Sequence, residues 1–129
     1  MRIEHIALWT TDLERSIQFY VTYFGASAAP RYVNAAKGFE SCFLSFTDGA
    51  RLELMTTSTL SPLVIDPGAQ RMGLTHFAIA LGSATEVDAL TRQLEADGYP
   101  TLDGPRHTGD GYYESVVLDP DGNRIELTV

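Results

Sequence analysis

The sequence has little positive charge and almost no cysteine. It contains one lysine, Lys37, and eight arginines scattered along 129 residues, and its net charge is −8. Binding to a nucleic-acid backbone needs clustered Lys and Arg, so this composition argues against a nucleic-acid partner. The single cysteine, Cys42, excludes a disulfide framework within the chain and is typical of a small buried hydrophobe.

Long hydrophobic runs are also missing. No apolar stretch is long enough to cross a membrane, and no signal-peptide pattern opens the sequence. We therefore expect a cytoplasmic protein with no membrane partner. Apolar residues still make up 44% of the chain and charged residues 20%, which are the proportions of an ordinary globular domain.

What the sequence does contain is an internal repeat. Residues 48–54 read DGARLEL and residues 121–127 read DGNRIEL, so that 73 positions separate Glu53 from Glu126. A strand-like segment with a histidine near its start opens each half of the chain.

These histidines, His5 and His76, are 71 positions apart. A nearly constant offset between two independent pairs of residues indicates one structural unit used twice.

Each half also contains one predicted helix. In the first half, Asp12 is a capping residue before a helical apolar stripe that ends at Gly25. In the second half, Ser83 and Glu86 form a capping-box pattern, and Gly98 ends the stripe.

Strand-like segments follow each predicted helix. Two hairpins are expected, with strands at 40–46 and 50–55 and at 112–118 and 123–129, because Asp-Gly dipeptides favour tight turns. Weaker strand candidates lie at 31–34 and 101–103. Each half therefore reads β-α-β-β-β, which predicts an α+β fold. We expect a single domain, 1–129, with units 1–56 and 73–129 joined by a linker, 57–72.

Strand side chains alternate between the two faces of a sheet. In four of the predicted strands the apolar residues share one face, which should pack on the helices. The other face carries one His or Glu per strand: His5, Glu53, His76 and Glu126. A lone His or Glu in a strand is more often structural or solvated, but recurrence in both halves favours a shared role. Two imidazoles and two carboxylates suit one divalent transition metal ion, such as Zn, Ni, Co, Mn or Fe.

Together these motifs resemble the vicinal oxygen chelate superfamily, which includes glyoxalase I, epimerases, extradiol dioxygenases and bleomycin-binding proteins. The segments that carry the resemblance are His5, TDLERSIQFY at 11–20, Phe24-Gly25, Glu53, GLTHFA at 73–78 and DPDGNRIEL at 119–127. The resemblance implies two βαβββ units that form an open, cup-shaped and partly closed barrel of mixed sheet, with helices on its outer face. It also implies a metal held by His5, Glu53, His76 and Glu126.

The set His-Glu-His-Glu resembles glyoxalase I most. The resemblance implies a metal-dependent isomerase or lyase that acts on a small substrate with adjacent oxygens through an enediolate. Glu126 is then the expected catalytic base and Glu53 its counterpart. Bacterial glyoxalase I usually has an arginine for the glutathione carboxylate where this chain has Trp9, so the substrate need not be the glutathione adduct. The alternatives are an antibiotic-resistance-like protein that binds or sequesters a small molecule, an epimerase, or a dioxygenase.

Further residues are candidates for a substrate pocket: Trp9, Arg51, Met55, Tyr112, Tyr113 and Arg124. The segment 108–113, with two glycines and two tyrosines, is either a lid over the substrate or an ordinary solvent loop. We expect a homodimer, because the βαβββ units of this superfamily often pair between chains.

Overall fold

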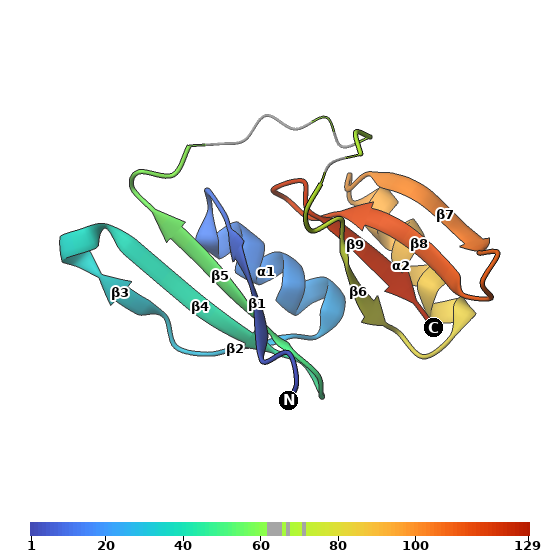
Figure 1. Ribbon diagram of the computed structural model, residues 1–129, viewed down its shortest axis with the longest axis horizontal. Coiled ribbons are helices and arrows are strands. Elements are labelled where there is room, and N and C mark those ends of the chain that lie inside the picture. Colours follow the sequence, from blue (N-terminus) through green and yellow to red (C-terminus); the bar gives the residue numbers. More distant parts are fainter. Residues whose placement is uncertain (62–65, 67, 71) are drawn as a thin grey trace. The chain divides into compact units, whose positions relative to one another are not determined.

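The computed structural model describes residues 1–61, 66, 68–70 and 72–129 (Figure 1). The chain forms two compact units, Met1–Leu63 and Val64–Val129. Of the linker predicted at 57–72, Thr57 is the last residue of a strand, while Pro62 and Pro67 lie outside the described residues.

The first unit contains one α-helix and one mixed sheet within its described residues. Its elements are β1 (His5–Trp9), α1 (Leu13–Phe24), β2 (Ser27–Ala28), β3 (Tyr32–Asn34), the short 3₁₀ helix η1 (Ala35–Lys37), β4 (Phe39–Ser45) and β5 (Arg51–Thr57). The strand order is β1-β5-β4-β2, and β3 also pairs with β4. Strands β1 and β5 are parallel, whereas β4 and β5 form the expected antiparallel hairpin.

The second unit repeats this plan. Its elements are β6 (Phe77–Ala80), α2 (Ala84–Ala96), β7 (Thr101–His107), β8 (Tyr113–Leu118) and β9 (Arg124–Thr128). The strand order is β6-β9-β8-β7, with β6 parallel to β9 and β8 antiparallel to β9. The described residues thus confirm the α+β class, with two helices and two mixed sheets that do not close.

Both helices begin and end where the capping residues predict. The Asp12 carboxylate accepts a hydrogen bond from the Arg15 amide at 3.0 Å, and Gly25 takes the left-handed conformation at the other end of α1. The Ser83 hydroxyl accepts from the Glu86 amide and donates to the Glu86 carboxylate.

The two hairpin turns are built alike. Gly49 and Gly122 occupy equivalent places and have φ angles of +84° and +83°, which favour glycine. Asp119 adds to the second turn, because its Oδ1 accepts from the amides of Asp121 and Asn123. The segment predicted weakly at 101–103 extends to His107 as β7. A strand with a proline at 105 is tolerated here because β7 lies at the edge of its sheet.

Each helix covers the apolar face of its own sheet. In the first unit Leu52 and Leu54 are buried with Tyr20 of α1, and in the second Ile125 and Leu127 are buried with the α2 stripe. The opposite face of each sheet is left for the ionisable residues. No helix in the described part of the chain has the length and apolar character needed to cross a lipid bilayer.

Candidate metal centre

The first histidine and glutamate lie together on neighbouring strands. Strands β1 and β5 run parallel, and their register places Ala7 opposite Glu53. The Nε2 atom of His5 lies 3.8 Å from the Oε2 atom of Glu53. Their side chains are 39% and 18% exposed, so both are accessible from the face away from α1. We call His5 and Glu53 the first half-site.

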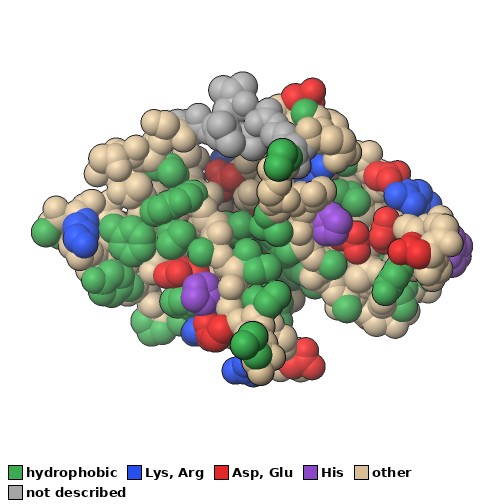
Figure 2. Space-filling view, in the orientation of Figure 1, with side chains coloured by type: hydrophobic (Ala, Val, Ile, Leu, Met, Phe, Trp, Pro, Cys, Tyr) green, Lys and Arg blue, Asp and Glu red, His purple; other side chains and the backbone are tan. Residues whose placement is uncertain are grey.

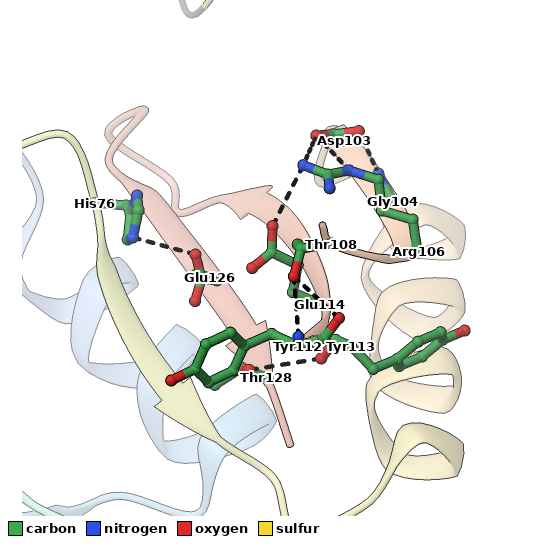
Figure 3. A network of polar contacts seen from close by, with 10 residues as sticks. All are labelled: His76, Asp103, Gly104, Arg106, Thr108, Tyr112, Tyr113, Glu114, Glu126 and Thr128. Atoms are coloured by element: carbon green, nitrogen blue, oxygen red, sulfur yellow. Dashed lines mark hydrogen bonds and ion pairs between the residues drawn. The ribbon is translucent and has the colours of Figure 1, made fainter. Parts of the chain in front are cut away.

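The second unit builds the same pair. His76 immediately precedes β6, and Ala78 of this strand is opposite Glu126 of β9. The Nε2 atom of His76 lies 3.1 Å from the Oε2 atom of Glu126 (Figure 3). The exposed fractions, 39% and 16%, nearly match those of the first pair. We call His76 and Glu126 the second half-site.

The donor chemistry of each half-site fits part of a transition-metal site. An imidazole nitrogen and a carboxylate oxygen already lie within a few ångströms of each other and are open to solvent, and both are ligands of Zn and similar ions. Among the described residues, no group of three or more His, Cys, Asp or Glu side chains gathers in a metal-binding cluster. Each half-site therefore offers two protein ligands, whereas a catalytic zinc site typically uses three.

A carboxylate and a guanidinium surround the histidine of the first half-site. Glu4 Oε2 lies 2.6 Å from His5 Nδ1, and Arg51 Nε donates to Glu4 Oε1 at 2.8 Å. The hydrogen bond with His5, together with Arg51, lowers the pKa of the Glu4 carboxyl. The Arg51 guanidinium also stacks on the Phe43 ring, 4.1 Å from its centroid. Arg51 was predicted to line the pocket. Its guanidinium instead contacts Glu4 and Phe43, next to the first half-site.

Aromatic and apolar side chains cover much of the same face of the first sheet. Trp9 is 48% exposed, and its ring meets Phe39 edge-on at 6.2 Å. Tyr32 of β3, the strand that pairs with β4, lies at the same centroid distance from Phe39. Met55 is opposite Trp9 in the β1–β5 register. Hydrophobic side chains accordingly gather over β3, β4 and β5 in the space-filling view (Figure 2). The predicted pocket residues Trp9 and Met55 therefore do lie together.

The second half-site has a carboxyl group beside it instead of aromatic rings. Glu114 of β8 lies on the same sheet face as Glu126 (Figure 3). Burial, and then the Glu126 carboxylate, raises the pKa of Glu114, and a hydrogen bond with Glu126 acts in the same direction. Arg106 opposes this shift from 3.3 Å, but its guanidinium also binds Asp103 at 2.7 Å.

The remaining pocket candidates lie apart from one another. Arg124 donates from Nη2 to the Ala69 carbonyl at 2.9 Å. Tyr112 is 56% exposed, whereas the Tyr113 hydroxyl donates to Asp88 of α2 at 2.7 Å. The two tyrosines point in opposite directions (Figure 3). Tyr113 therefore lies on the helix side of the sheet, away from Glu126.

The predicted lid segment forms a turn closed by its own hydrogen bonds. The Thr108 amide donates to the Tyr112 carbonyl at 2.8 Å, and the Tyr112 amide donates to the Thr108 hydroxyl at 2.9 Å. Closure of this segment over a substrate stays a prediction.

Two residues next to the half-sites, Glu4 and Glu114, were not found from the sequence. Glu4 was overlooked because strict strand alternation sends its side chain away from His5, but β1 begins only at His5. The position of Glu114, in contrast, could have been predicted from the sequence. Counting back through the 119–122 turn places Glu114 on the face of Glu126.

Comparison with known proteins agrees with this geometry. Residues 2–127 match the model of the Glyoxalase/Bleomycin resistance protein/Dioxygenase superfamily. The protein YqjT of Bacillus subtilis is 31% identical over 97% of this chain and 96% of its own, and PA2024 of Pseudomonas aeruginosa is 31% identical over 98% and 86%.

Solved structures give the same result for the fold. Glyoxalase I of Leishmania major superposes with a TM-score of 0.78, at 24% identity, over 99% of this chain and 86% of that chain. Glyoxalase I of Zea mays gives a TM-score of 0.79 at 25% identity, over 98% of this chain and 44% of that chain. Because the family model spans nearly the whole sequence, the chain belongs to the Glyoxalase/Bleomycin resistance protein/Dioxygenase superfamily, as the motifs indicated.

Proposed function

We propose that this protein is a metal-dependent isomerase or lyase of glyoxalase type, in which His5, Glu53, His76 and Glu126 hold one divalent ion. The observation that carries the proposal is the duplication of a paired, accessible imidazole and carboxylate. Each pair lies on the sheet face that the helix does not cover. Similarity to glyoxalase I of Zea mays supports the reaction class.

Catalysis in this proposal depends on one carboxylate that moves a proton. A divalent ion held by the four residues would supply a Lewis acid for two adjacent substrate oxygens. Glu126 then takes a proton from one substrate carbon and returns it to the neighbouring carbon. Glu53 occupies the equivalent place in the first unit and serves as its counterpart.

The charged groups near the half-sites argue against a highly anionic substrate. Arg51 pairs with Glu4, Arg106 pairs with Asp103 and Glu114, and Arg124 donates to a backbone carbonyl. A glutathione carboxylate would have to displace one of these contacts, since Trp9 replaces the expected arginine. We infer that the substrate is a small molecule with adjacent oxygens and an uncharged, apolar remainder.

One observation favours a second candidate function. The exposed ring of Trp9, with Phe39 and Tyr32 beside it, is also suited to holding a flat apolar molecule without chemistry. A binding or sequestering protein on the same fold would use this face. In either case we propose a homodimer, which light scattering on the purified protein tests directly.

The decisive assay measures proton exchange at carbon. Metal-free protein is loaded with Zn or Ni and incubated in D₂O with a small α-hydroxyketone, and separately with methylglyoxal plus glutathione. We expect NMR to show deuterium entering the carbon next to the carbonyl of the hydroxyketone, and little product from the glutathione adduct. Glu126→Gln should lower the exchange rate by about 10²- to 10⁴-fold, whereas the matched variant Glu114→Gln, on the same sheet face, should retain it. Tight binding of aryl compounds without exchange in any substrate would instead support the sequestering protein.

A further inference from the structure

We propose that Glu4 is a positioning residue for metal binding, because it holds the ring hydrogen of His5 on Nδ1 and leaves the Nε2 lone pair for the ion. This inference rests on the proposed function of the first half-site. It adds a residue outside the four ligands, and it concerns the state of the protein before an ion binds.

The contact between Glu4 and His5 determines which ring nitrogen carries the hydrogen. Glu4 Oε2 lies 2.6 Å from His5 Nδ1. An ionised carboxylate can only accept hydrogen bonds, so Nδ1 must be the donor. A neutral imidazole has one N–H group, and therefore Nε2 carries a lone pair. Nε2 is also the atom that faces Glu53, at 3.8 Å.

Glu4 is itself held at several points. Arg51 Nε donates to Glu4 Oε1 at 2.8 Å, and the Arg51 amide donates to the Glu4 carbonyl at 3.0 Å. The Arg51 guanidinium stacks on Phe43, whose ring also meets the His5 ring edge-on at 5.4 Å. The guanidinium that holds the Glu4 carboxylate and the His5 imidazole thus contact the same aromatic side chain. This arrangement limits the directions in which His5 can turn.

The second half-site lacks this device. Residue 75, which precedes His76, is a threonine, and within the described residues no carboxylate contacts His76 Nδ1. The short contact of His76 is instead the one from Nε2 to Glu126, at 3.1 Å. In the described part of the chain, nothing on Nδ1 therefore fixes the tautomer of His76, and its Nε2 atom faces the carboxylate of its own half-site. Of the two histidines, His5 is the one whose Nδ1 has a carboxylate partner among the described residues, which leaves Nε2 free to bind an ion.

Partners of this kind have a measurable effect. A carboxylate that accepts the second ring N–H of a metal-binding histidine fixes its tautomer and raises its basicity, and its loss typically weakens metal binding by about 10- to 100-fold. We expect Glu4→Leu to weaken Zn²⁺ binding by this factor. Glu4→Gln should lose less, because its amide carbonyl still accepts from Nδ1.

The test combines two measurements on the full chain. Long-range ¹H–¹⁵N NMR spectra of the metal-free protein, at a pH where His5 is neutral, report which nitrogen of each histidine carries the hydrogen, and His5→Gln identifies the His5 signals. Competition titration with a Zn²⁺ chelator gives the affinity. Glu14→Gln, which removes another exposed carboxylate that pairs with an arginine of the same unit, is the matched control.

We expect His5 to carry its hydrogen on Nδ1 in the wild type and in Glu4→Gln, and to shift toward Nε2 in Glu4→Leu. Zn²⁺ affinity should fall in the order wild type, Glu4→Gln, Glu4→Leu, with Glu14→Gln equal to wild type. An Nε2–H tautomer in the wild type would overturn the proposal, as would equal Zn²⁺ affinity in wild type and Glu4→Leu. If the wild type binds no Zn²⁺ at all, the proposed function fails, and the NMR spectra still decide whether Glu4 sets the tautomer.

Discussion

The two half-sites share their donors and differ in what surrounds each histidine. Next to His5, a carboxylate, a guanidinium and an aromatic ring form a connected set of contacts. Next to His76, the close polar contact within the described residues is to the glutamate of the same half-site, at 3.1 Å. The two units thus share the same metal-donor residues, whereas the residues around each histidine differ. We infer that the first half-site is prepared to receive an ion, and that the second has no such partner for its histidine among the described residues.

The open faces of the two sheets differ in the same way. On the neighbouring strand, Phe43 lies opposite Glu53 in the first unit and Val116 lies opposite Glu126 in the second. The second unit has Ala80 at the position equivalent to Trp9 of the first. Glu114 adds a carboxyl to the second face. The first unit therefore supplies apolar surface, and the second supplies carboxyl groups.

The largest expected effect separates the two glutamates. If Glu126 is the base, Glu126→Gln should lower the rate of proton exchange by about 10²- to 10⁴-fold, the usual contribution of a general base. Glu53→Gln should act mainly through metal affinity and should recover much of its rate at high Zn²⁺ concentration. Exchange rates measured by NMR over a Zn²⁺ series test this. Equal recovery of the two variants would show that neither glutamate has a special role.

Trp9 gives the next largest effect. Trp9→Arg should raise kcat/KM for the methylglyoxal–glutathione adduct by roughly 10- to 100-fold, because a charged hydrogen bond to a carboxylate contributes about 1.5–3 kcal/mol. Ala80→Arg, at the equivalent position of the second unit, is the control and should gain little. The ordinary lactoylglutathione assay measures both. Efficient wild-type turnover, at about 10⁴ M⁻¹s⁻¹ or above, would contradict the role given to Trp9.

Glu114 gives the smallest effect, on stability. Its pKa is raised in the folded state, so the folded protein binds this proton more tightly than the unfolded chain. Stability is therefore unaffected below the ordinary glutamate range and falls as pH rises through that range toward the raised pKa. Glu114→Gln should remove this loss and stabilise the metal-free protein by about 1 kcal/mol at neutral pH.

Urea unfolding of both proteins in the presence of a chelator, across a pH series, measures the difference. It should vanish in acid and grow toward neutral pH. A variant that is less stable than wild type at neutral pH would indicate that the contact between Glu114 and Arg106 outweighs the burial of the charge.

Much of this fold follows from local signals in the sequence. Asp12, Gly25 and Ser83 set the helix ends, and the glycines of the two turns set both hairpins, because each acts through its own backbone neighbours. The alternation of Leu52 and Leu54 with Glu53 correctly gave the buried and open faces of β5. Such features need only the period of a helix or strand.

The surroundings of the half-sites were harder to predict, because they depend on register and on strand ends. Glu4 reaches His5 only because β1 begins at His5, so that Glu4 lies before the strand and does not follow its alternation. Tyr113 was grouped with the pocket although strand parity puts it on the helix side with Asp88. Pairing across strands decides these contacts, and no single segment of sequence contains that information.

The central claim is that the two half-sites bind one ion together, and metal stoichiometry tests it most directly. Purified metal-free protein is titrated with Zn²⁺ by calorimetry, alongside His5→Ala and His76→Ala. We predict one ion per chain in the wild type, and loss of tight binding in both variants, since each removes one ligand of the same ion. Two ions per chain, with each variant losing only one of them, would contradict the claim and show that each half-site acts alone.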